Sequence, residues 1–299
     1  MDDSIFSTAV LPVALAVIMV SLGMSLTLAD FRRVFEEPRG VGIGLLNLLV
    51  LSPLLAFAIA EAFHLDPVLA VGLVLLGASP GGTMANLMTH FARGETALSI
   101  TMTAISSIAA VVTVPLFLKL ATHHFGTGRL DMDVNMVGVV ARVLLITVVP
   151  LALGMWLRAR RPEAVARFGP GLRRAVAVLF AGAVIGVVIA EHHRVFDNLQ
   201  AVALAAITLN ISAMAMSFTI ARFARLDNRQ ATAIAMELGI HNSTLAIAVG
   251  ASIATVLTIP AAVYAAFMFI PAGLFAWFMY RRNMAAEPPP ELAGTRAPT

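Results

Sequence analysis

The residues best suited to chemistry lie in the middle of two long apolar stretches. One stretch contains Pro80-Gly81-Gly82-Thr83 followed by Asn86, and the other contains Glu237 followed by His241-Asn242-Ser243-Thr244. A carboxylate with amide and hydroxyl oxygens nearby is a donor set for a hard cation, because such ions prefer oxygen ligands. The chain of 299 residues contains no cysteine, which excludes disulfides, thiolate metal sites and a cysteine nucleophile.

A local interpretation of the same residues stays open. Glu237 and His241 are one helical turn apart and could form an ion pair. A cation is favoured over that pair, because a carboxylate within a membrane span costs roughly 2.5 to 3.5 kcal/mol and needs a strong partner. Ser99 and Thr103 share one face of the next span. Taken alone, these two hydroxyls are better explained as packing contacts between helices.

The composition places these residues in an integral membrane protein. Hydrophobic residues make up 59% of the chain and charged residues only 12%, whereas soluble domains carry about a quarter charged residues. The lipid bilayer is therefore a partner and nucleic acid is not. Apolar stretches long enough to cross a bilayer number about nine. Their approximate limits are 5–28, 41–63, 66–90, 96–121, 134–157, 174–190, 199–220, 230–252 and 258–279.

The positive charges predict how these spans are oriented. Most of the 20 lysine and arginine residues fall in gaps that share one side of the membrane if the N-terminus is outside and the C-terminus is cytoplasmic. We expect residues 1–284 to form a single transmembrane unit in the cell membrane, which for a bacterial chain is the inner membrane. Residues 285–299, with three consecutive prolines, are expected to form a disordered cytoplasmic tail.

Two of the nine spans are interrupted in corresponding positions. Pro80-Gly81-Gly82 cannot continue a regular helix, and the polar run after Glu237 breaks the pattern of the eighth span. Paired broken helices in two halves of a chain indicate an inverted-repeat transporter with its site at the midplane. A packed kink would explain one such span, but it explains two spans and an acid less well. The predicted fold is therefore all-α and polytopic, an inverted repeat with two broken helices.

The breaks also predict the charge of the substrate. Each break starts a half-helix, and helix N-termini favour anions. We expect an organic anion with its carboxylate toward Thr83, Asn242 and Ser243. No HExxH or phosphate-binding motif is present, so no enzymatic function and no organic cofactor are predicted.

These motifs resemble the bile acid:sodium symporter family, including the bacterial homologues of the apical bile-acid transporter. The resemblance extends over almost the whole chain. It is carried by Gly23-Met24-Ser25-Leu26-Thr27-Leu28, Pro80-Gly81-Gly82-Thr83 with Asn86, Ala92-Arg93-Gly94-Glu95, and Glu237-Leu238-Gly239-Ile240-His241-Asn242-Ser243. It implies a core of spans 41–121 and 199–279, in which the two broken helices cross. It also implies a panel of spans 5–28, 134–157 and 174–190 that moves against the core, with the apolar part of the substrate in the cleft between core and panel.

The resemblance also implies sodium as the coupling ion, at two sites. The first would use Asn86, Ser99, Thr103 and Glu237. The second would use Glu237, His241 and backbone carbonyls around Leu238 and Ile240.

The chain departs from the family pattern at three positions. Ala85 stands where a serine is common, and His241 and Leu48 stand where glutamines are expected. A proton on His241 could replace one sodium ion, because histidine changes charge near neutral pH; a neutral ring that donates one nitrogen ligand is an equal alternative.

The predicted function is thus sodium-coupled symport of an organic anion, such as a bile acid, pantoate or a similar carboxylate, by alternating access. The alternatives are a proton-coupled organic-anion carrier and a membrane ligand sensor that does not transport.

Overall fold

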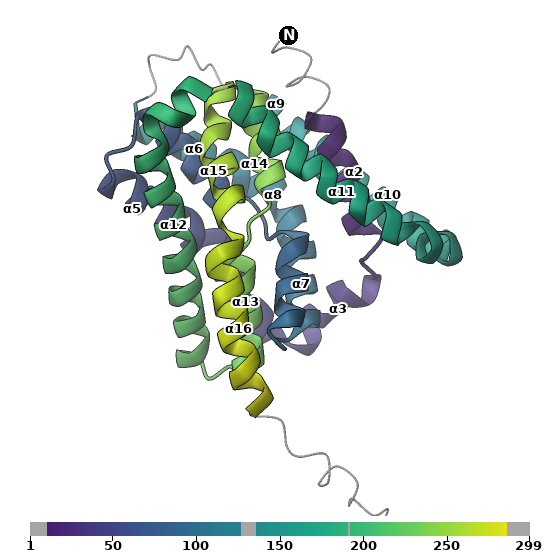
Figure 1. Cartoon of the computed structure of the whole chain (residues 1–299). Helices are drawn as coiled ribbons and strands as arrows, with labels where there is room; N and C mark the ends of the chain where they lie inside the picture. The colour runs from purple at the N-terminus through teal and green to yellow at the C-terminus, as the bar shows by residue number, and fades with distance from the viewer. Residues whose placement is uncertain (1–10, 127–135, 191, 286–299) are drawn as a thin grey trace, which may run out of the picture.

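The computed structural model describes residues 11–126, 136–190 and 192–285, and within these ranges it is almost entirely helical (Figure 1). The elements are α2 (Leu11–Gly23), α3 (Leu28–Glu36), α4 (Pro38–Leu46), η2 (Asn47–Leu51), α5 (Ser52–Ala62), α6 (Pro67–Gly77), α7 (Thr83–Phe91), α8 (Thr96–His124), α9 (Met136–Val143), η3 (Leu144–Val148), α10 (Val149–Arg160), α11 (Pro162–Ala190), α12 (His192–Phe223), α13 (Asn228–Gly239), α14 (Ser243–Ala251), η4 (Thr255–Thr258), α15 (Ile259–Phe267) and α16 (Phe269–Ala285).

Aspartate side chains cap the N-termini of two helices, α6 and α13, where the chain enters the apolar region. Asp66 accepts a hydrogen bond from the Val68 backbone NH at 3.0 Å, and Pro67 follows it as the first residue of α6. Asp227 caps α13 in the same way, through the backbone NH of Gln230 at 2.8 Å. Such caps satisfy amides that have no partner within the helix, so they fix where the half-helices that reach the site begin.

The described residues include five helices that are long and apolar enough to span a membrane, and up to seven if two bent pairs count as single spans. The predicted number of nine is not reached by this criterion, since the two interrupted spans consist of helices of only 9 to 12 residues. Nine spans and an inverted repeat therefore stay predictions. The first predicted span differs in detail, because α2 ends at Gly23 and α3 follows at a bend of 65°. The predicted tail lies outside the described residues, apart from Ala285.

Helices α2, α10 and α11 lie together on one side of the molecule (Figure 1). Gly23 on α2 and Gly154 on α10 allow this packing, because a Cβ on Gly23 would be 2.1 Å from the Leu151 carbonyl oxygen. Small residues let helix backbones approach closely in membranes. These helices correspond to the predicted panel, with α11 beginning twelve residues before the predicted limit at residue 174. Their grouping as a panel and their movement against the other helices stay predictions.

The two interrupted spans cross at their breaks. Gly81 and His241 form an antiparallel β-bridge. The Gly82 NH donates to the Ile240 carbonyl and the Asn242 NH donates to the Pro80 carbonyl, both at 2.8 Å. Backbone groups released from a helix inside a membrane must find partners within the protein. Each break therefore supplies partners for the other.

Candidate functional site

Where the two breaks cross, Glu237 packs against Gly81, which has no side chain. Glu237 is fully buried on the last full turn of α13. A Cβ on Gly81 would lie only 1.7 Å from Glu237 Oε2. Glycine is thus required at position 81, and the carboxylate occupies the space where a side chain would be.

Three polar residues from the other interrupted span and from α8 surround this carboxylate. Ser99 Oγ lies 2.6 Å and Thr103 Oγ1 2.9 Å from Glu237 Oε1. The same two hydroxyls lie 2.7 and 3.2 Å from Asn86 Oδ1. The structure brings together all four residues predicted for the first ion site. Packing alone, the other interpretation of Ser99 and Thr103, would not require both hydroxyls to meet one carboxylate.

This cluster has more acceptors than hydrogens. Ser99 and Thr103 have one hydroxyl hydrogen each, and Thr103 Oγ1 is also 3.1 Å from the Ser99 carbonyl oxygen. Glu237 Oε2 is buried with no hydrogen-bond partner among the described residues. A buried charged oxygen without a partner is costly. The donor set therefore fits a hard cation such as sodium, which oxygen atoms of this kind can coordinate.

The residues of the second predicted ion site are placed differently. The Ile240 carbonyl accepts the Gly82 NH at 2.8 Å, so it takes part in the crossing. Leu48 and Leu238 are both buried in one apolar cluster with Met102. The side chain of Leu48 thus supplies no ligand where the family pattern has glutamine.

His241 is buried, and its ring is hydrogen-bonded away from Glu237. Nδ1 lies 3.2 Å from the Ser79 carbonyl oxygen and Nε2 lies 3.0 Å from Ser52 Oγ. Since a carbonyl only accepts, Nδ1 carries the hydrogen, and in the neutral ring Nε2 accepts from Ser52. Both ring nitrogens are therefore used within the protein, and the polar partners of Glu237 are Ser99 and Thr103 instead of this ring.

Two polar residues that sequence analysis did not identify hold the end of α13. Asn210 Nδ2 donates to the Gly239 carbonyl at 2.6 Å, and the Tyr264 hydroxyl donates to the same oxygen at 2.8 Å. Asn210 and Tyr264 are buried on α12 and α15. This carbonyl lies at a helix end where partners within the helix are lost. The two donors therefore fix the C-terminal end of α13, the half-helix that carries Glu237.

Tyr264→Phe should weaken sodium binding while leaving the protein folded. It removes one of the two donors to the Gly239 carbonyl, which should cost about 1 kcal/mol of folding stability. We expect the apparent sodium dissociation constant to rise about three- to tenfold, because the backbone beside Glu237 is held less firmly. Thermal unfolding across a sodium titration measures both effects, with Tyr280→Phe as the control. Lower stability with unchanged sodium affinity would make Tyr264 a purely structural residue.

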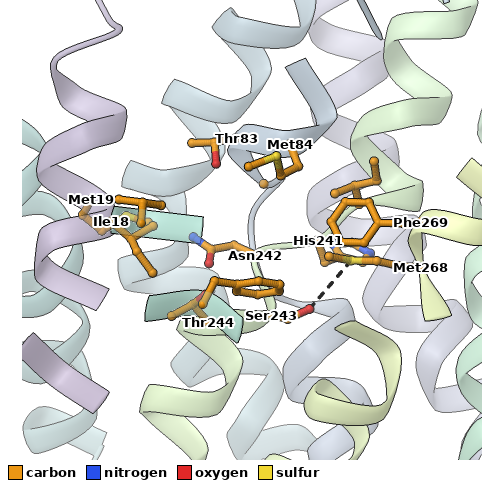
Figure 2. Close-up of a pocket in the computed structure, with 14 residues that line it drawn as sticks. Ile18, Met19, Thr83, Met84, His241, Asn242, Ser243, Thr244, Met268 and Phe269 are labelled. Carbon is orange, nitrogen blue, oxygen red and sulfur yellow. Dashed lines mark hydrogen bonds between the residues drawn. The ribbon is translucent and has the colours of Figure 1, made fainter. Parts of the chain in front are cut away.

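A pocket of about 220 Å³ adjoins the crossing. The three residues predicted to bind substrate line it together: Thr83 begins α7, Asn242 caps α14 through the Leu245 NH, and Ser243 begins α14. Figure 2 shows the Ser243 hydroxyl directed toward Met268, 4.0 Å from its sulfur. The remaining wall is largely apolar and includes side chains from α2 and α11: Ile18, Met19, Val176 and Phe180.

Comparisons with known proteins identify the family of the chain. A sequence model of the sodium bile acid symporter family matches residues 12–220. The match covers well over half of the chain and includes Asn86, Ser99 and Thr103, although it ends before Glu237.

Three curated relatives show the range of the similarity. The chain is 31% identical over 239 residues to a probable chloroplastic sodium/metabolite cotransporter of Arabidopsis thaliana, covering 79% of this chain and 58% of that protein. It is 29% identical over 238 residues to the uncharacterized sodium-dependent transporter YocS of Bacillus subtilis, covering 80% and 72%. It is 25% identical over 250 residues to the human ileal sodium/bile acid cotransporter, covering 82% and 70%.

The aligned region is less than two thirds of the Arabidopsis protein, so the activity of that whole protein does not transfer directly. All three relatives are named as sodium-dependent transporters or cotransporters. The apolar helices indicate a multi-pass membrane protein, and the family match shows that the chain belongs to the sodium bile acid symporter family.

Proposed function

We propose that this protein is a secondary active transporter that imports an organic anion together with one sodium ion. The observation that carries the proposal is the cluster around Glu237. Four oxygen-bearing side chains converge there, and Glu237 Oε2 is buried with no hydrogen-bond partner among the described residues. A monovalent hard cation would supply the missing positive charge and coordinate the surplus acceptors.

A single sodium ion is the stoichiometry that these contacts support best. The second predicted site would need His241 and the Ile240 carbonyl, and both are engaged with other partners. Leu48 is packed in an apolar cluster. The electrochemical gradient of one sodium ion per transport cycle would then have to drive accumulation of the substrate.

The pocket supports an organic anion as that substrate. The N-termini of α7 and α14 meet in it, at Thr83 and Ser243. Backbone NH groups and the positive ends of two helix dipoles favour a carboxylate at this point. Ile18, Met19 and Phe180 form an apolar wall for the rest of the molecule. Bile acids, pantoate and similar carboxylates fit this description.

The position of the pocket supports alternating access. Its apolar wall belongs to α2 and α11, and its polar wall belongs to the crossing breaks. A shift of the predicted panel against the core would open the pocket to one side of the membrane and then to the other. By the distribution of arginines, the end of the bundle with Arg33, Arg93 and Arg229 faces the cytoplasm of a bacterial inner membrane.

Purified protein in detergent and in liposomes tests the proposal. Thermal unfolding should show higher stability in sodium than in potassium at equal ionic strength, since an ion that binds only the folded state stabilises it by mass action. An inward sodium gradient should then drive accumulation of radiolabelled pantoate or taurocholate in liposomes. Binding without accumulation would indicate a sensor. Equal unfolding temperatures in sodium and potassium would contradict the sodium site.

A proton at His241 is a second candidate for coupling, and one contact of the ring is compatible with it. Ser52 Oγ can accept a hydrogen bond as well as donate one, so the ring keeps its partner if Nε2 is protonated. Uptake should then vary between about pH 5.5 and 8.5 at a constant sodium gradient, and His241→Gln should remove this variation. Uptake that is independent of pH in the wild type would exclude this candidate.

A further inference from the structure

A second, larger cavity lies at the other end of α7. It has a volume of about 600 Å³ and is lined by the end of α7, the loop to α8, the start of α8, and residues of α13 and α16. Its lining residues include His90, Arg93, Gly94, Glu95 and Arg229. None of its lining residues is shared with the pocket at the crossing.

Helix α7 connects the two cavities and passes the ion cluster on the way. Thr83, its first residue, lines the pocket at the crossing. Asn86, one turn later, belongs to the cluster around Glu237. Phe91, its last residue, lines the second cavity. The cluster therefore lies between two separate spaces along one short helix.

Only one layer of side chains separates the cluster from the second cavity. Thr89 is fully buried, and its hydroxyl lies 3.4 Å from Ser99 Oγ. On its other side, Thr89 contacts Gly94 of the cavity wall, where an added Cβ would be 2.9 Å from Thr89 Cγ2. The same Cβ would be 3.2 Å from Thr232 Cγ2, so these two threonines form the layer.

The hydrogen bonds of the two threonines differ. Thr232 Oγ1 donates to the Asn228 carbonyl at 2.5 Å and accepts from Asn283 Nδ2 at 3.3 Å. Thr89 Oγ1 is directed at the ion cluster through the long contact with Ser99. A threonine hydroxyl so placed can exchange that contact for a cation or a water molecule.

One carboxylate in the wall of the cavity, that of Glu95, can attract a cation. Burial, together with repulsion from Glu37 and Asp227, raises the pKa of Glu95 to about 7, while Arg33 opposes this shift. Glu95 is thus partly ionised at neutral pH. Arg93 lies over the ring of Tyr280, with 5.5 Å between its guanidinium carbon and the ring centre. Of the charged side chains that line the cavity, Arg93 and Arg229 are basic and Glu95 is acidic.

We infer that the coupling ion exchanges with water through this second cavity, past Thr89, by a route separate from that of the organic anion. The inference rests on the proposed function, since it requires an ion at Glu237. Separate routes would let the ion leave while the anion pocket is still closed, or the reverse. Thr89 is then a residue of the ion path that no motif in the sequence indicates.

The absence of cysteine in the chain allows a direct test with Thr89→Cys. The reagent is 2-(trimethylammonium)ethyl methanethiosulfonate, a water-soluble cation that reacts with accessible thiols. In liposomes with potassium, we expect the reagent to modify Thr89→Cys at least tenfold faster than Thr147→Cys. Thr147 is the control because it is equally buried but lies on η3, away from the second cavity. Sodium should slow modification of Thr89→Cys at least fivefold. Modification no faster than that of Thr147→Cys would overturn the inference.

A second variant keeps the inference testable if Thr89→Cys fails to fold. Ala97 lines the cavity but belongs to no part of the ion cluster. Ala97→Cys should exchange ²²Na⁺ like the wild type, and a bulky maleimide on this cysteine should slow the exchange at least fivefold. Unchanged exchange after complete labelling would overturn the route. A wild-type protein without sodium-dependent stabilisation would instead refute the proposed function, so the two failures are distinguishable.

Discussion

Glu237→Gln is expected to abolish the sodium-specific thermal stabilisation and to reduce concentrative uptake at least a hundredfold. The substitution keeps the size of the side chain and an oxygen that can accept from Ser99 and Thr103. It removes the charge that holds the cation. At a sodium concentration 100 times the dissociation constant, bound sodium contributes about 2.7 kcal/mol of stability, and this whole contribution should be lost.

The change in stability that Glu237→Gln causes in potassium makes the test specific, because it should not be a loss. Without sodium, the wild type has a buried carboxylate whose Oε2 has no hydrogen-bond partner among the described residues, whereas the variant is neutral there. The variant should thus be at least as stable as the wild type in potassium, since burying an uncompensated charge is unfavourable. Thermal unfolding in both salts measures this. Glu61→Gln is the control, since Glu61 is exposed and pairs with His124. A sodium-dependent shift that persists in Glu237→Gln would remove this residue from the ion site.

Gly81→Ala should have a comparable effect through geometry alone. The added Cβ would lie 1.7 Å from Glu237 Oε2 and 2.9 Å from the carboxyl carbon. Either the carboxylate moves away from Ser99 and Thr103, or the crossing separates and loses the bond from the Gly82 NH to the Ile240 carbonyl. Overpacking of this kind costs about 1 to 3 kcal/mol. We expect lower stability together with loss of sodium binding and uptake.

The matched control for Gly81→Ala is Gly42→Ala. Gly42 is a helical glycine in α4 at which a Cβ would meet no atom within 4 Å. Alanine there should raise stability by up to about 1 kcal/mol through helix propensity. Combining Gly81→Ala with Glu237→Asp shortens the carboxylate and should restore part of the lost stability in potassium. If Gly81→Ala has the same unfolding temperature and the same sodium affinity as Gly42→Ala, the close approach of Glu237 to Gly81 is wrong.

The helices and the two breaks could be predicted because they depend on local rules. Apolar runs of sufficient length form spans, and Pro80-Gly81-Gly82 ends a helix in any surroundings. Ser99 and Thr103 were assigned to one helix face from their spacing alone. The number of spans was harder to predict, since two spans consist of short half-helices and α2 ends at Gly23 before the bend to α3.

Residues that act through long-range contacts could not be found in this way. Ser52 binds a histidine 189 positions later, and Asn210 and Tyr264 meet on one carbonyl of α13. Each is a single polar residue in an apolar helix, and at the level of sequence such residues are explained equally well by packing. Nothing in their spacing indicates a shared partner.

By itself the sequence determined the membrane class, the position of the breaks and the presence of an acid next to one of them, because hydropathy and backbone restrictions act over a few residues. Only the tertiary structure decided which oxygens surround Glu237 and that the ring of His241 is bound by Ser52 and Ser79. It alone placed Thr89 between the cluster and a second cavity. The physical reason is that these contacts join helices far apart in the chain, whose relative placement is set by packing and not by any local preference.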